Sequence, residues 1–136
     1  MRSSRIALSV LVAALVSIVG CGGPKMASVE GTVTCNGQPV KGVIVVFNPV
    51  PSDGETAVTR PSMGVTDDAG HYVLSTEREG DGAAVGKHKV SISPAAQTDD
   101  TTEPEDVLPG TLPKDYVVEV KPGDNTIDLE LTPSKR

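Results

Sequence analysis

The sequence has few aromatic residues: it contains no tryptophan, two tyrosines and one phenylalanine. A base-stacking platform or an aromatic sugar-binding face needs several rings close together, so the composition argues against both kinds of site. Positive charge is also scarce, because 18 acidic side chains outnumber 12 basic ones and leave a net charge of −6. We therefore expect no nucleic acid partner and no electrostatic attraction to anionic lipid.

The residues of common catalytic and metal sites are also missing. The only two histidines are His71 and His88. His71 falls in a turn next to Asp67, and His88 is in phase with the apolar Val90, so both positions favour a structural role over that of a catalytic base. No HExxH or CxxC spacing indicates zinc or iron. We expect a protein that is not an enzyme and that holds no cofactor and no metal.

The beginning of the chain has the pattern of a secretory signal that ends in a lipidated cysteine. Arg2 and Arg5 precede the apolar run 6–19, whose helical length of about 21 Å is too short for a bilayer core of about 30 Å. The run ends in Ile18-Val19-Gly20-Cys21, which resembles the bacterial lipoprotein box. The resemblance implies that the signal peptide, residues 1–20, is removed as a helix-forming leader. It also implies that lipid on Cys21 anchors the protein to the cell membrane or outer membrane, facing outside the cytoplasm.

Cys35 is left without a partner in the chain once Cys21 carries lipid, so we expect no disulfide. Cys35 shares one face of an alternating pattern with Val29 and Val33 and is expected to be buried as a small hydrophobic residue. Residues 21–27 are expected to form a flexible tether of about 15 Å. The domain would therefore lie close to the membrane.

The rest of the sequence predicts β-strands. Apolar and polar residues alternate over 29–35, 88–92, 116–120 and 127–131, which is typical of strands with one buried face. Residues 43–47 are all apolar, and this run predicts a central strand covered on both faces. With no helical period after the signal peptide, we expect an all-β domain over 28–132, a seven-stranded antiparallel β-sandwich, followed by a tail at 133–136.

Short turns join the predicted strands. Asn36-Gly37 suits a tight hairpin because both residues accept a positive φ, and Gly70 can close a turn that begins at Asp67. Met63 and Val65 before that turn, and the residues 72–74 after it, predict a second hairpin. We assign structural turn roles to Asn36, Gly37, Asp67, Gly70, Gly123 and Asn125.

Two segments, 48–61 and 94–113, are too long for hairpin connections and are the places where a binding site could differ from the scaffold. The second carries five carboxylates: Asp99, Asp100, Glu103, Glu105 and Asp106. Oxygen ligands of this kind suit calcium, although such a charge run is more often a solvated segment. An alternative prediction is a ligand-binding envelope protein that uses these two loops for carbohydrate or calcium.

Several segments resemble carboxypeptidase regulatory-like domains, which belong to the transthyretin-like sandwiches. Residues 29–33, 36–40 and 43–47 resemble the opening of that family, and 65–74 its second hallmark. Residues 86–92 resemble the third, with His88 where an aromatic residue is usual, and 123–131 resemble the closing hairpin. The resemblance implies a non-catalytic, lipid-anchored module of the cell envelope, which is structural or contacts an envelope protein or surface polymer.

Overall fold

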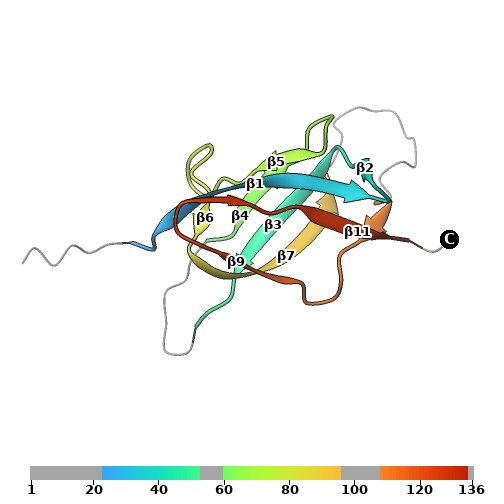
Figure 1. The fold of residues 1–136 in the computed structure, drawn as a ribbon. Coiled ribbons are helices and arrows are strands. Elements are labelled where there is room, and N and C mark those ends of the chain that lie inside the picture. Colours follow the sequence, from blue (N-terminus) through green and yellow to red (C-terminus); the bar gives the residue numbers. More distant parts are fainter. Residues whose placement is uncertain (1–22, 53–59, 96–107, 135–136) are drawn as a thin grey trace, which may run out of the picture.

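The computed structural model describes residues 23–52, 60–95 and 108–134, and these form strands and no helix (Figure 1). No described segment is therefore a helix able to cross a membrane. The expected signal-peptide helix and Cys21 lie outside the described residues. The strands are β1 (Met26–Cys35), β2 (Gln38–Pro39), β3 (Val43–Pro49), β4 (Ser62–Val65), β5 (His71–Val73), β6 (Ala83–Ala84), β7 (Gly86–Pro94), β8 (Gly110–Thr111), β9 (Val117–Val120), β10 (Asp124–Thr126) and β11 (Leu129–Pro133).

The strands form two sheets. In the first, the long strand β1 is central: β10 and β11 lie on one side of it, and β2, β5 and β6 pair with its other side. The strand β8 extends this sheet beyond β11. The second sheet has the order β4-β3-β7-β9 and is antiparallel throughout. The all-β prediction is thus confirmed for the described residues.

The prediction of a purely antiparallel arrangement is wrong for the first sheet, because β10 and β11 run parallel to β1. The predicted closing hairpin is also wrong. β9 lies in the second sheet and β10 in the first, so the chain crosses between sheets at 121–123 instead of turning back on its neighbour. Gly123, with a φ of 96°, lies in this crossover. The chain therefore meets β1 in the same direction as β1 itself.

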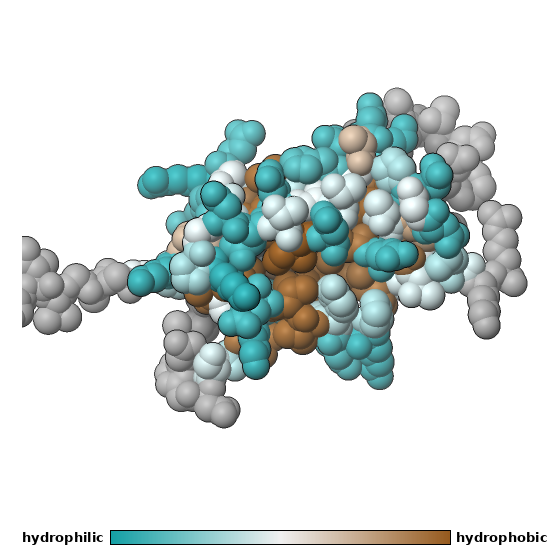
Figure 2. Space-filling model, in the orientation of Figure 1, coloured by the Kyte–Doolittle hydropathy of each residue, from teal (hydrophilic) through white to brown (hydrophobic). Residues whose placement is uncertain are grey.

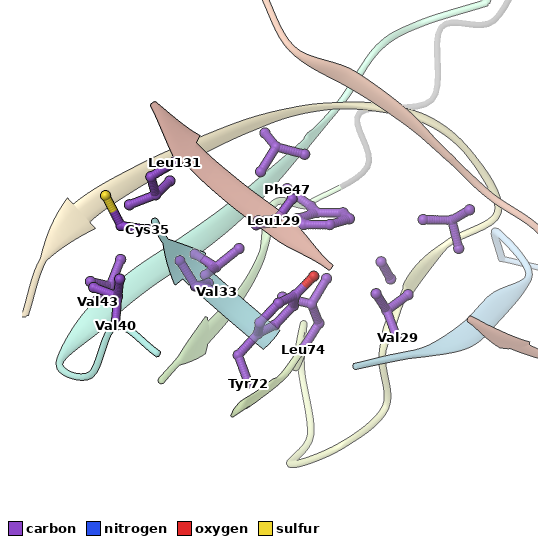
Figure 3. Packing of buried hydrophobic residues seen from close by; sticks show 14 of the residues in the cluster. Val29, Val33, Cys35, Val40, Val43, Phe47, Tyr72, Leu74, Leu129 and Leu131 are labelled. Atoms are coloured by element: carbon purple, nitrogen blue, oxygen red, sulfur yellow. The ribbon is translucent and has the colours of Figure 1, made fainter. Parts of the chain in front are cut away.

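A single core fills the space between the sheets, as Figure 3 shows for its central residues. It includes Val29, Val33 and Cys35 on the inner face of β1, as the alternation predicted. Cys35 is 7% exposed and is a free thiol, and its Sγ lies 3.6 Å from the carbonyl oxygen of Pro109. Half-buried residues complete the core at its margin: Val85, Ile92, Leu108, Leu112, Tyr116, Val118 and Ile127.

Hydrophobic residues also gather in the middle of the face that Figure 2 shows, between strands of the two sheets, and hydrophilic residues surround them. Half-buried hydrophobic residues on both sheets, such as Val118 and Ile127, pack against the buried cluster. We therefore interpret this apolar surface as the margin of the core.

Tyr72 links β5, across β1, to the segment between β10 and β11 in the first sheet. It lies on β5, opposite Gly31 on β1, and its hydroxyl donates a hydrogen bond to the carbonyl oxygen of Ile127, 2.5 Å away, between β10 and β11. In Figure 3 the hydroxyl oxygen points toward the start of β11. A Cβ on Gly31 would collide with the Ile127 carbonyl and would lie 3.0 Å from the Tyr72 oxygen. Only glycine leaves room for this contact.

Burial raises the pKa of the Tyr72 phenol, and the nearby Asp128 carboxylate raises it further. The reason is that the buried site disfavours the charged phenolate. The neutral hydroxyl that donates to Ile127 is therefore the favoured form.

The structure changes three boundaries that the sequence predicted. β1 begins at Met26, inside the segment expected to be a tether, because Met26 and Ala27 pair with Ala84 and Ala83. β11 extends to Pro133, into the expected tail. β8 lies inside the segment 94–113 that was expected to be a loop. Gly110 permits this pairing, since a side chain there would collide with the backbone of Thr132.

Candidate functional site

The strand β4 has its apolar and polar faces reversed. Its side chains Met63 and Val65 are each 56% exposed, whereas Ser62, Gly64 and the adjoining Thr66 face the core and are buried. A strand that borders a core normally places its apolar residues inside. A one-residue shift in register would bury both apolar side chains, so the observed register has to be held by other contacts.

Hydrogen bonds from the inward polar side chains hold this register. The Thr66 hydroxyl oxygen accepts a bond from the Val43 amide, 3.0 Å away, on the neighbouring strand β3. The Ser62 and Thr76 hydroxyl oxygens are 2.6 Å apart, and the Thr76 hydroxyl also reaches the Gly82 carbonyl at 2.7 Å. Because buried polar groups are costly to leave unpaired, these bonds oppose the shift that would bury the apolar side chains.

Gly64 brings β4 close to β5. A Cβ on Gly64 would lie 2.5 Å from the carbonyl oxygen of Val73 on β5, so a larger residue would separate the two backbones. Next to it, the backbones of Met63 and Ser75 exchange two hydrogen bonds of 2.8 and 2.9 Å. This close approach places the 42% exposed Val73 beside the exposed side chains of β4.

These strands form a shallow groove on the outer surface, with a volume of about 490 Å³. Its lining residues are Ile44, Met63, Gly64, Val65, Asp67, His71, Val73, Ser75 and Glu79. We call this surface the β4 groove. Ile44 comes from β3, whose unbroken apolar run predicted a strand covered on both faces. That prediction is wrong for the outer face, because Ile44 and Val46 are only half-buried among the described residues and Ile44 faces the groove.

The charged residues that line the β4 groove are acidic, and no lysine or arginine is among them. Asp67 is fixed in place, because its Oδ1 accepts hydrogen bonds of 2.9 Å from the amides of Ala69 and His71. His71 Nε2 lies 3.5 Å from a carboxylate oxygen of Glu30. The groove therefore combines the aliphatic side chains of Ile44, Met63, Val65 and Val73, which we call its floor, with the carboxylates of Asp67 and Glu79, which we call its rim.

The predicted turn residues are at the ends of strands and have structural contacts. Asn36 and Gly37 have φ values of 52° and 75° and connect β1 to β2 in a two-residue hairpin. Gly70 has a φ of 75°, and a Cβ there would lie 2.7 Å from the Val33 carbonyl oxygen. Asn125 bridges Lys121 and Ser28, through bonds to the Lys121 amide and carbonyl and to the Ser28 carbonyl. Of these turns, only the one at Asp67 borders the groove.

The two histidines lie in different environments. His88 is 1% exposed, packs against Phe47 with a ring-centroid distance of 5.9 Å, and has its Nε2 2.6 Å from the Ala84 carbonyl oxygen. Its Nδ1 has no hydrogen-bond partner in the described part of the chain. His71 is partly exposed at the groove. The ring of His88 thus lies in the core, and the ring of His71 lies at the surface.

Two further hollows are each lined by residues of both charge signs. One, of about 360 Å³, lies near the start of β1 and contains the Arg60–Glu77 ion pair, 3.6 Å apart. Asp81 in this hollow accepts the amides of Thr76, Glu77 and Arg78, and the bond from Thr76 is the main reason that its pKa is lowered. The other hollow, of about 430 Å³, is lined by both Lys87 and Glu119.

The loops of the alternative prediction are described only in part. The five carboxylates proposed for calcium lie within 96–107, outside the described residues. Within the described ranges, no three histidine, cysteine, aspartate or glutamate side chains are placed to hold a metal ion together. The β4 groove is therefore the candidate site that the described residues build.

Comparison with known proteins finds little similarity to this chain. No protein-family model and no curated protein matches the chain. A crystal structure of a DUF3823 family protein from Parabacteroides merdae aligns with a TM-score of 0.44 and 17% sequence identity. The alignment covers 82% of this chain and 48% of the other, so the chain spans about half the length of that protein. At this similarity, function has to be argued from the chain's own residues.

Proposed function

We propose that this protein is a lipid-anchored, non-catalytic binding module of the cell envelope, with a β-sandwich of the transthyretin-like, carboxypeptidase regulatory-like kind. The observation that carries the binding role is the reversed strand β4, which keeps Met63 and Val65 on the surface. Aliphatic side chains gathered at the surface contribute little to folding, whereas they gain free energy when a partner covers them. A one-residue shift in register would bury both side chains, and the hydrogen bonds of Ser62 and Thr66 oppose that shift.

The proposed anchor lies immediately before the folded domain. The Lys25 carbonyl already accepts a hydrogen bond from the Val85 amide, 2.8 Å away, so the folded part starts there. Only residues 22–24 separate Lys25 from Cys21, and the four residue steps from Cys21 to Lys25, at about 3.5 Å each, span about 14 Å at most. An acylated Cys21 would thus hold the domain against the bilayer surface.

The sandwich assignment is supported by the turns that carry the family resemblance. Asn36-Gly37 forms the two-residue hairpin that the opening segment needs, and Asp67 to Gly70 forms the turn of the second hallmark. The third hallmark corresponds to β7, whose His88 fills a core position beside Phe47. The parallel β10 and β11 are the point at which the chain departs from the expected pattern.

The anchor can be tested in a bacterial host that processes lipoproteins. We expect the wild-type chain to sediment with membranes and its intact mass to correspond to residues 21–136 plus at least a diacylglyceryl group. Cys21→Ser should lose that mass increment and the membrane association. Cys35→Ser, which changes the other cysteine, should keep both. An unmodified mass for the wild type, or a leader that is still attached, would overturn the proposed anchor.

A further inference from the structure

We infer that the β4 groove binds an extended peptide segment whose aliphatic side chains alternate with lysine or arginine. This inference rests on the proposed binding role and names the partner chemistry of that site. The juxtaposition that carries it is an aliphatic floor, formed by Ile44, Met63, Val65 and Val73, beside a rim in which Asp67 and Glu79 are the charged lining residues.

The floor has the spacing of an extended chain. Met63 and Val65 are two residues apart on one strand, so their side chains lie on the same face about 7 Å from each other. Side chains of a bound extended segment repeat at the same interval, so aliphatic residues at alternate positions of the segment can cover both floor residues. Val73, across the close approach at Gly64, extends the floor sideways.

The rim selects positive charge. Asp67 cannot turn away, because the Ala69 and His71 amides hold one of its carboxylate oxygens. Glu79 lines the same groove, and no lysine or arginine among the lining residues neutralises either carboxylate. His71 also lines the groove, and its Nε2 lies 3.5 Å from a carboxylate oxygen of Glu30. The basic side chains between the aliphatic ones point to the opposite face of an extended segment, but the flexible four-carbon stem of lysine lets its charge bend back toward the carboxylates of Asp67 and Glu79.

The same charges argue against two other occupants. A second copy of the chain, related by a twofold axis, would bring Asp67 and Glu79 of one copy against the same acidic rim of the other. Anionic lipid would meet the negative rim directly. Like charges placed together cost free energy in both cases, so a basic peptide fits this groove better than either.

The inference can be tested with synthetic ten-residue peptides and the full processed chain in phosphatidylcholine nanodiscs. Fluorescence anisotropy would measure the Kd of three labelled peptides, in which Val alternates with Lys, Val with Glu, or Ser with Lys. We expect the Val–Lys peptide to bind at least about ten times more tightly than either other peptide, a difference of about 1.4 kcal/mol. Equal binding of the Ser–Lys or the Val–Glu peptide would overturn the inference.

Two variants locate the binding site. Val65→Lys places a positive charge on the groove floor and should weaken binding of the Val–Lys peptide at least about tenfold. Val117→Lys is the matched control, because Val117 is 48% exposed and lies on β9, away from the groove lining. It should leave the Kd unchanged. Equal losses in both variants, or no loss in Val65→Lys, would contradict the inference.

Two further measurements separate the remaining outcomes. Self-association that Val65→Lys abolishes, or binding of phosphatidylglycerol vesicles that Val65→Lys strengthens, would assign the groove to a second copy or to lipid and overturn the inference. Soluble Cys21→Ser protein should bind the Val–Lys peptide as tightly as the anchored chain does. If the proposed lipid anchor is wrong, the peptide measurement can therefore still be interpreted. If the peptide does not bind, the proposed lipid anchor is unaffected.

Discussion

The inner face of β1 and the outer face of β4 contain the same kinds of side chain in opposite environments. Val29 and Val33 on β1 are fully buried, whereas Met63 and Val65 on β4 are each 56% exposed. Strand alternation is respected in both, so the difference comes from register and from the partners of the inward residues. The comparison indicates that packing around β1 contributes much of the free energy of unfolding. The exposed side chains of β4 contribute little to it.

Gly31→Ala should cause the largest loss of stability. The added Cβ would collide with the Ile127 carbonyl and push against the Tyr72 hydroxyl, so β1 must separate from β5 or from the β10–β11 side. We expect the free energy of unfolding to fall by about 3 kcal/mol or more, measured by urea denaturation.

Gly37→Ala is the control for Gly31→Ala. Gly37 has a φ of 75° but nothing within 4 Å of a Cβ, so this change adds backbone strain without a collision. We expect a loss of only about 1 kcal/mol. If the two variants lost equal stability, the close packing at Gly31 would not be the source of its effect.

Tyr72→Phe should cost about 1–2 kcal/mol, because a partly buried hydrogen bond to the Ile127 carbonyl is lost and that bond to the acceptor is not replaced. Urea denaturation at neutral pH measures this loss.

The same variant tests the pH dependence. Since burial raises the pKa of Tyr72, its contribution is complete below the ordinary tyrosine pKa of about 10 and is lost as the pH rises above that value. The wild type should therefore lose stability above about pH 10, and Tyr72→Phe should lose less. Parallel pH curves for the two proteins would show that Tyr72 is not the group responsible.

The sequence predicted the local features of the first sheet because they depend on short-range chemistry. The Asn36-Gly37 hairpin follows from two residues that accept positive φ, and the inward face of β1 follows from alternation. The parallel pairing of β10 and β11 could not be predicted from alternation, because the period of two is the same in parallel and antiparallel strands. Gly31 and Tyr72 are 41 positions apart, so their contact also depends on the assembled sheet.

Asn125→Ala tests the crossover that brings the chain onto β1, and we expect a loss of about 1 kcal/mol. The substitution removes the side-chain bonds to Lys121 and Ser28 at an exposed site. Thermal unfolding would measure the effect. Asp124→Ala, an exposed change in the same turn, is the control, and a loss of similar size there would assign the effect to the turn in general.

Val65→Lys should have the smallest effect on stability, within about 0.5 kcal/mol of the wild type, because the side chain is mostly exposed. Urea denaturation checks this value. Val45→Ala on the neighbouring strand is the comparison, since Val45 is fully buried and its truncation should cost about 2 kcal/mol or more. A large loss in Val65→Lys would mean that the β4 face belongs to the folding core.

The groove itself was not predicted, although two signals for it are present in the sequence. In the segment 62–66, small or polar residues at 62, 64 and 66 alternate with Met63 and Val65. The run 43–47 supplies apolar residues to both faces of β3. Each signal is ambiguous alone, because a strand pattern does not reveal which of its faces is buried. The hydrogen bonds of Ser62 and Thr66 decide this, and they depend on contacts with Thr76 and Val43.

Methyl NMR of the full chain tests the central comparison most directly. Valine methyl groups occur in both regions, and the groove adds those of Ile44 and Met63, so one titration with the Val–Lys peptide observes both regions at once. The account predicts concentration-dependent shifts at Ile44, Met63, Val65 and Val73, and unchanged signals at Val29 and Val33. Shifts centred on Val117, or the absence of shifts at the four groove residues at saturating peptide, would contradict it.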